Sequence, residues 1–327
     1  MKNWGACFVS DAQIKKYGIT DFIQYTYSEQ KYIEKNPANF EIIEYDIFAS
    51  IIRVKDQCTY YDVNLMAADN NNIIILRDVA ESFRQQRFDG GAVQINLPDI
   101  HVWIDADGEA TISRINRESP GRMLVAEIMI MANWLMAKFL KANDMPAVYR
   151  SQNAPRERLY KGNEGTIFEN YMQRRFLSRF VLNYRPEHHS GLGLNAYVTA
   201  TSPIRKYFDL ATQRQIRAVL GLEEPYSEKE MDHIIQMLGQ PMGDVSRIQY
   251  NRNRYWLLKY LEKRIGQKEE AIVLFKRRNN YRILLTEYVL ECDLAQSSGI
   301  SLKPEDLIQV TLQHADARKD VVSVFMG

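Results

Sequence analysis

The sequence predicts an α+β chain, in which a domain of mixed sheet and several helices precedes a small all-β barrel. Two observations carry this prediction. Apolar residues recur at helical spacing through residues 72–87 and 120–143. Residues 271–325 instead hold five short runs rich in β-branched and aromatic residues, each bounded by turn-forming residues.

Composition and charge are those of an ordinary globular chain. Of the 327 residues, 46% are hydrophobic and 25% are charged, which excludes a disordered or low-complexity protein. The net charge of +1 does not by itself indicate a nucleic-acid binder. The charge is uneven, however: residues 146–264 carry 19 Lys and Arg against 12 Asp and Glu, whereas residues 1–145 carry 15 against 20. A locally basic middle fits an electrostatic groove, with a solvated charged face as the alternative.

The cysteines and the apolar stretches indicate a cytoplasmic protein without a membrane partner. Cys7, Cys58 and Cys292 are scattered and odd in number, which argues against a disulfide framework and against a zinc site. No apolar run follows a basic start, so we expect no signal peptide. The longest apolar stretch, residues 123–140, is interrupted by charged residues such as Glu127. It therefore predicts a buried helix and not a membrane span.

Two features of the first half concern carboxylates. Glu127 lies among apolar residues of the predicted helix 120–143, and it needs a partner because burying an unpaired carboxylate costs several kcal/mol, roughly. Asp105 and Asp107 alternate just before Gly108, and alternate acids in a loop can hold a divalent cation. The later ligands of such a loop are missing, so we expect a hairpin turn there.

The second half holds a glycine-rich loop and a long basic segment. His188 and His189 open the loop, and without an acidic partner at a fixed spacing we expect them to be exposed. A capping box at 227–230 starts a helix that we expect to break at 239–241, before a second helix over 244–264. That helix carries Arg252 and Arg254 among aromatic residues, a pattern that suits RNA backbone contact and base stacking, or simple packing.

The last 60 residues, roughly, predict a barrel of the OB type, because five short strands follow one another there. Lys276 and Arg278 fall at the first hairpin of this barrel and form a predicted RNA-contact edge. A purely structural barrel is the alternative.

The stretch from Tyr197 to Leu210 combines capping residues with a cation. Ser202 or Thr201 suits the N-cap of a helix, and Pro203 suits the first helical position. Arg205 would then lie in the first turn, where a guanidinium beside free N–H groups can bind a phosphate oxygen. The alternative is a capped surface helix with Arg205 in a salt bridge.

These residues resemble the T-S-P-I-R-[RK]-Y-x-D-L signature of the RNase II/RNase R family, 3′→5′ exoribonucleases that share the RNB catalytic domain. Residues 124–133 and 149–155 resemble the family's V-x-E-x-M-x-x-A-N helix and its Y-R-x-x-x-x-P segment. The resemblance implies that Arg205 is catalytic, near the scissile phosphate, and that Glu127 lies near the RNA 3′ end. A Glu127 that pairs structurally with an arginine is the alternative. The full set of predicted RNA-binding residues is Glu127, Arg205, Lys206, Tyr207, Arg252, Arg254, Lys276 and Arg278.

The resemblance also sets the predicted domains. Residues 40–266 correspond to part of an RNB domain and residues 267–327 to an OB-type RNA-binding domain, while residues 1–39 stay unassigned. The family holds Mg²⁺ with aspartates spaced D-x-x-x-x-x-D-x-D-D near the start of its RNB domain. Before residue 60 this chain has only isolated aspartates, so we expect it to contain no metal site.

Three interpretations follow, and they leave open whether the chain is an enzyme by itself. It is a fragment or split subunit of an exoribonuclease acting on single-stranded RNA, completed by an upstream polypeptide and unable to hydrolyse alone. Alternatively, it is a non-catalytic protein that binds single-stranded RNA, or a partial domain that is stable only with a partner.

Overall fold

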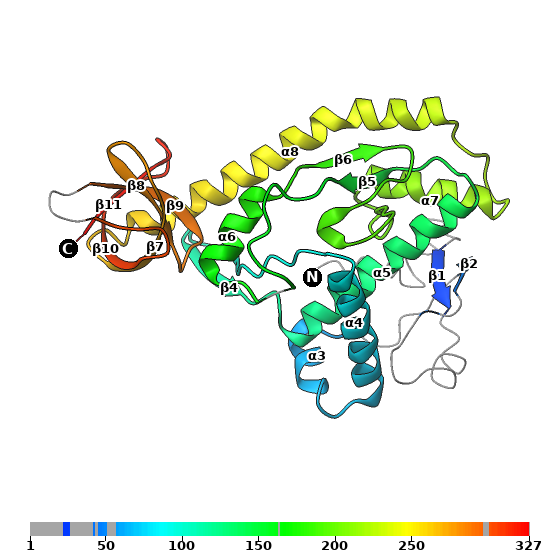
Figure 1. The fold of residues 1–327 in the computed structure, drawn as a ribbon, viewed down its shortest axis with the longest axis horizontal. Coiled ribbons are helices and arrows are strands. Elements are labelled where there is room, and N and C mark those ends of the chain that lie inside the picture. Colours follow the sequence, from blue (N-terminus) through cyan, green and yellow to red (C-terminus); the bar gives the residue numbers. More distant parts are fainter. Residues whose placement is uncertain are drawn as a thin grey trace. The chain divides into compact units, whose positions relative to one another are not determined.

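The computed structural model describes residues 22–26, 42, 45–50, 57–162, 164–296 and 301–326. They group into two compact units (Figure 1). The ranges of unit 1 are Met1–Gln94, Glu118–Arg156 and Leu177–Leu238, and those of unit 2 are Ile95–Arg117, Glu157–Phe176 and Gly239–Gly327. Of the segment that the sequence leaves unassigned, 1–39, only the strand 22–26 is described. The predicted boundaries at 40 and 267 stay predictions.

Unit 1 is built mainly from helices, with two short antiparallel strand pairs, β1–β2 and β5–β6. Its elements are β1 (Phe22–Thr26), β2 (Asp46–Ser50), α3 (Tyr60–Met66), α4 (Asn71–Asp89), α5 (Pro120–Ala142), β5 (Tyr149–Gln152), β6 (Phe180–Asn183), η1 (Ser190–Leu192), α7 (Tyr207–Val219) and the first part of α8 (Glu228–Glu262). The predicted helices 72–87 and 120–143 are confirmed as α4 and α5.

Helix α5 forms the centre of unit 1 and packs against α3, α4 and α7. Met136, Ala137 and Leu140 are almost fully buried, and they pack against Tyr149 and Ile216. By length and composition α5 could cross a membrane, but half of its most apolar window is buried inside the protein. The predicted buried helix is therefore confirmed.

Unit 2 combines a hairpin, a helix and a barrel. Its elements are β3 (Asp99–Ile104), β4 (Ala110–Ile115), α6 (Ile167–Phe176), the rest of α8, β7 (Lys268–Lys276), β8 (Asn280–Leu285), β9 (Leu290–Ala295), β10 (Leu307–Asp316) and β11 (Val321–Phe325). The last five strands close a barrel in the order β10-β11-β9-β8-β7, with β10 pairing back to β7. Inward-facing residues such as Val273, Ile283 and Leu312 are fully buried. The fold class is confirmed, and this barrel is consistent with the OB type.

The aspartate loop of unit 2 is a turn, as predicted. It joins β3 to β4, and Asp105 Oδ1 accepts the backbone N–H groups of Asp107 and Glu109 at 3.0 and 2.8 Å. Gly108 takes the left-handed conformation that this turn requires, with φ of 79°.

One helix boundary differs from the prediction. The capping box at Ser227 and Glu230 forms, but the helix does not break at 239–241: α8 runs through Pro241 over 35 residues. Proline removes one backbone donor and so frees one carbonyl of the preceding turn. This part of α8 is almost entirely exposed, so water can satisfy that carbonyl.

Candidate functional site

The segment that carries Arg205 is a turn before a helix, and not the first turn of the helix. Arg205 N and Lys206 N both donate to Ser202 O, at 3.2 and 3.0 Å, and α7 begins only at Tyr207. The predicted cap at Ser202 and helix start at Pro203 are therefore wrong. The hydroxyl of Ser202 instead accepts from the Arg205 guanidinium at 3.3 Å.

Three side chains from the two neighbouring helices hold the extended backbone ahead of this turn. Asn133 on α5 accepts the N–H of Ala200 at 3.0 Å, and Gln213 on α7 donates to the carbonyl of the same residue at 2.7 Å. Asp209 on α7 accepts the N–H of Ser202 at 2.9 Å. Because Asn133, Ser202 and Asp209 are buried, water does not compete for these bonds. The position of the turn is therefore set by α5 and α7.

The turn presents its polar side chains to solvent. Arg205, Lys206 and Tyr207 are all exposed. Within the described ranges no carboxylate lies in ion-pair distance of Arg205, so the salt bridge considered as its alternative role is not observed. The Arg205 guanidinium is thus a solvent-accessible cation on a rigidly held turn, and this arrangement suits an anionic ligand.

A buried polar cluster lies behind the turn, made of Tyr197, His189 and Arg150. The hydroxyl of Tyr197 accepts from Asn133 at 3.2 Å, and its ring lies edge-on to His189 with centroids 5.7 Å apart. Arg150 stacks on the ring of Phe180 at 3.9 Å. Burial lowers the pKa of Arg150 and raises the pKa of Tyr197, because in both cases it disfavours the charged form of the side chain.

The expectation that both loop histidines are exposed is wrong for His189. His188 is exposed, but His189 is only 4% exposed, with Nδ1 accepting the N–H of Leu192 at 3.3 Å. Burial, reinforced by the positive charge of Arg150, lowers the pKa of His189 to about 4. Its Nε2 is buried and has no hydrogen-bond partner among the described residues. Sequence spacing gave no sign of this cluster, because its members come from distant segments.

Glu127 forms a buried ion pair. The Arg87 guanidinium donates from Nε to Oε2 at 2.9 Å and from Nη2 to Oε1 at 2.5 Å. Arg87 and Glu127 are 2% and 3% exposed. The structure thus shows the arginine-paired glutamate that the sequence left open as an alternative. A contact between Glu127 and RNA stays a prediction, and it requires the carboxylate to leave Arg87.

The other predicted RNA-binding residues lie in unit 2. Arg252, Lys276 and Arg278 are exposed, the last two at the end and in the loop of the β7–β8 hairpin. Arg254 is ion-paired with Asp320 in the turn between β10 and β11. Within unit 1 the structure brings together Arg205, Lys206 and Tyr207, and it holds Glu127 apart from them inside the core.

The comparisons with known proteins identify the family. The model of the RNB domain family matches residues 33–167 and 159–221. The chain belongs to the RNB domain family. The predicted resemblance to RNase II and RNase R is confirmed, since curated relatives carry these names.

Two curated relatives match most of this RNB chain. An uncharacterized ribonuclease of Synechocystis sp. is 29% identical and covers 85% of this chain and 43% of its own length. The chloroplastic and mitochondrial ribonuclease II of Arabidopsis thaliana is 28% identical and covers 86% of this chain and 37% of its own length. The chain therefore spans less than half the length of these relatives.

Solved structures share the fold of this RNB chain. An active-site mutant of the Dss1 exoribonuclease from Candida glabrata has a TM-score of 0.75 at 21% identity and covers 86% of this chain and 40% of its own. Mycoplasma genitalium RNase R in complex with ribose-methylated single-stranded RNA has a TM-score of 0.73 at 15% identity, covering 87% and 55%. Yeast Ssd1, a pseudonuclease, has a TM-score of 0.59 at 14% identity, covering 79% and 37%.

Exoribonucleases of the RNB family typically depend on Mg²⁺, and the buried carboxylates of unit 1 described above do not fit this ion. Both oxygens of Glu127 are engaged by Arg87. Asp209 keeps one buried oxygen without a hydrogen bond, but a single carboxylate oxygen is not a magnesium site. The part of the chain that the structure describes contains no group of three His, Cys, Asp or Glu residues able to hold a metal.

Three of the four positions of the family's aspartate spacing do occur in the sequence, at Asp99, Asp105 and Asp107, but Gly108 takes the fourth. The structure excludes them as a metal cluster. Asp99 begins β3 and pairs with Arg117 at 2.8 Å, whereas the other two lie in the turn at the far end of that strand. Six residues of extended strand separate them by about 20 Å.

Proposed function

We propose that this chain is the phosphate-clamping part of a cytoplasmic 3′→5′ exoribonuclease of the RNase II/R type, acting on single-stranded RNA. Hydrolysis would need metal-binding carboxylates from another polypeptide. The observation that carries the proposal is the exposed Arg205, which has no carboxylate partner among the described residues and lies on a turn that α5 and α7 hold in place. The RNA-bound RNase R structure that shares this fold supports the choice of ligand.

In this proposal the turn and the start of α7 act together on one phosphate. The Arg205 guanidinium would donate to two phosphate oxygens, a geometry that a lysine cannot provide. Lys206, the N-cap residue of α7, gives no side-chain hydrogen bond to the first turn, so N–H groups at the start of α7 can donate to the same anion. Lys206 and Tyr207 flank this position, and would add a further charge and a stacking surface.

The first test is RNA binding by the Arg205→Gln variant. We expect the Kd for single-stranded RNA to rise about tenfold, and the slope of log K against log salt to fall in magnitude by about 0.7, because one phosphate contact is lost. Fluorescence anisotropy with a labelled oligonucleotide at several salt concentrations measures both. The matched control is Lys229→Gln, which removes an exposed charge elsewhere in unit 1. Equal effects of the two variants would contradict a specific clamp at Arg205.

The second test is complementation. The chain is mixed with Mg²⁺ and a polypeptide that carries the four-aspartate cluster of an RNase II/R relative, and 5′-labelled single-stranded RNA is added. We expect shortening from the 3′ end only when both polypeptides are present, and a rate about 100-fold lower with Arg205→Gln, because a charge that stabilises the transition state is lost. Intact RNA in the complete mixture would rule out the split-enzyme proposal.

A non-catalytic protein that binds single-stranded RNA is the second candidate. Two observations favour it. The described residues contain no cluster of side chains able to hold a metal ion, and the fold is similar to that of the pseudonuclease Ssd1. The two tests separate the candidates: salt-sensitive RNA binding without shortening in the mixture supports the binding protein.

A further inference from the structure

The outer face of the barrel strands β7, β8 and β9 is covered by α6. Leu274 and Leu284 point outward from the barrel and are buried against Tyr171 of α6. Above them Glu291 of β9 accepts from the Tyr171 hydroxyl at 2.6 Å and from the Arg175 guanidinium at 2.7 Å. OB-type barrels commonly bind oligonucleotides on the face of their second and third strands. In this chain α6 occupies that face.

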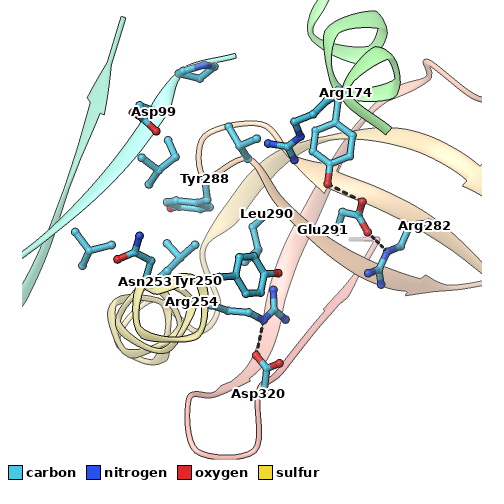
Figure 2. Close-up of a pocket in the computed structure, with 16 residues that line it drawn as sticks. Asp99, Arg174, Tyr250, Asn253, Arg254, Arg282, Tyr288, Leu290, Glu291 and Asp320 are labelled. Carbon is cyan, nitrogen blue, oxygen red and sulfur yellow. Dashed lines mark hydrogen bonds and ion pairs between the residues drawn. The ribbon is translucent and has the colours of Figure 1, made fainter. Parts of the chain in front are cut away.

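A cavity of about 550 Å³ remains open beside α6, inside unit 2 (Figure 2). Its wall comes from α6, α8, β3, β8, β9 and the turns that follow β8 and β10. The volume lies within the range of about 300–1,000 Å³ that small-molecule sites occupy, and it is enough for one nucleotide. Polar groups such as Arg174, Asn253 and Arg282 share the lining with apolar groups such as Ile100 and Leu290.

The lining holds three carboxylates and three arginines and so has no net charge, but one of these arginines has no ion-pair partner in the described chain, because Asp99 pairs with Arg117 outside the lining. Each of the three acidic residues already has an arginine partner. These ion pairs are Asp99–Arg117, Glu291–Arg282 and Asp320–Arg254. Arg174 is exposed and stacks on the ring of Tyr171 at 4.7 Å, and no carboxylate of the described chain lies in ion-pair distance of it. Because Arg174 has no ion-pair partner in the described chain, its guanidinium can bind the single negative charge of one phosphodiester.

The cavity also offers a surface for a base. The side chain of Tyr250 reaches it from α8, yet 64% of this residue is exposed, which leaves the ring accessible. In Figure 2 Arg174 and Tyr250 approach the cavity from different helices. Tyr288 and Leu290 are buried and form part of the apolar wall. Stacking on an aromatic ring tolerates every base and therefore suits a protein that binds RNA without sequence preference.

We propose that this cavity binds one nucleotide of single-stranded RNA, with its phosphodiester on Arg174 and its base on Tyr250. The proposal rests on the RNA binding proposed above and assigns to it a site in unit 2 distinct from Arg205. RNA then contacts this unit beside α6, while the strand face of the barrel stays covered by that helix.

The test uses two variants of the full chain and two controls. Arg174→Gln should raise the Kd for single-stranded RNA about fivefold and reduce the salt slope by about 0.7, whereas Tyr250→Ala should raise the Kd about tenfold and leave the slope unchanged. Tyr250→Phe keeps the ring and should bind like the wild type. Lys303→Gln removes an exposed charge of unit 2 outside the cavity and should also bind like the wild type. Thermal unfolding should not change, because both tested side chains are exposed.

A second measurement locates the RNA directly. An oligonucleotide containing 4-thiouridine is photo-crosslinked to the wild-type chain, and peptides are mapped by mass spectrometry. Crosslinks in 250–257 or 282–291 support the cavity. Wild-type affinity in both Arg174→Gln and Tyr250→Ala, with crosslinks only elsewhere, overturns this proposal and leaves the proposed function standing. A wild-type chain that shows no salt-sensitive RNA binding overturns both.

Discussion

Replacing Arg87 with methionine is expected to lower the free energy of unfolding by about 3–5 kcal/mol. The reason is the bidentate pair with Glu127, in which both side chains are almost completely buried. Without Arg87 the carboxylate has only the more distant Arg84 Nε, 3.9 Å away, as an ion-pair partner, so it either keeps a poorly compensated buried charge or takes up a proton at a cost in free energy. Urea denaturation followed by circular dichroism measures the change.

The matched control for this variant removes both charges. Arg87→Met combined with Glu127→Leu should recover most of the lost stability, because no unpaired charge stays behind. A loss below about 1 kcal/mol in the single variant would contradict a strong buried pair. The double variant also separates the two roles of Glu127: unchanged affinity for single-stranded RNA supports the structural role, whereas weaker binding would support a contact with RNA.

Lowering the pH from 7.5 to 4 is expected to remove about 3 kcal/mol of stability through His189 alone. Its pKa is lowered to about 4 in the folded chain, mainly by burial, against an ordinary value of 6.5. The unfolded chain therefore takes up a proton near pH 6.5, while the folded chain resists protonation until about pH 4. The contribution is complete above pH 6.5, declines as the pH falls, and is lost near pH 4.

The two adjacent histidines provide the control for this pH dependence. His189→Gln should flatten the profile of unfolding free energy between pH 6.5 and 4, whereas His188→Gln should keep the wild-type slope, because His188 is exposed. Urea denaturation at intervals of half a pH unit gives the profiles. Parallel curves for the wild type and His189→Gln would show that this histidine is not buried in its neutral form.

The sequence predicted those helices and strands whose apolar residues recur at a regular spacing. Helix α4 (Asn71–Asp89) contains the predicted range 72–87, and the barrel strands follow their β-rich runs. The predicted start of α7 was wrong because Asp209, seven residues further along, accepts the N–H of Ser202, which leaves a turn where capping rules favour a helix. The predicted helix break at Pro241 was also wrong. Proline usually ends a helix because it removes a backbone hydrogen bond, but in an exposed segment water can satisfy the freed carbonyl.

The exposed residues of the site could be predicted from the sequence, but the buried residues that hold them in place could not. Arg205 follows from the signature, but Asn133, which holds the backbone ahead of it, lies 67 residues from its partner Ala200. Arg87 and Glu127 are 40 residues apart, on different helices. Such pairings depend on tertiary packing, so no spacing within a single element reveals them. The burial of His189 likewise depends on tertiary packing and could not be predicted from the sequence.

The covering of the barrel by α6 sets an order of events during synthesis. Tyr171 and its partner Glu291 are separated by 120 residues. At about 5–20 residues per second, the ribosome makes the second member roughly 6–24 s after the first. During that interval the apolar side of α6 and Leu97, which precedes β3, have no barrel to pack against. Unit 2 is thus completed only when the last strands leave the ribosome, and a nascent chain stalled before β9 would be a natural substrate for chaperones.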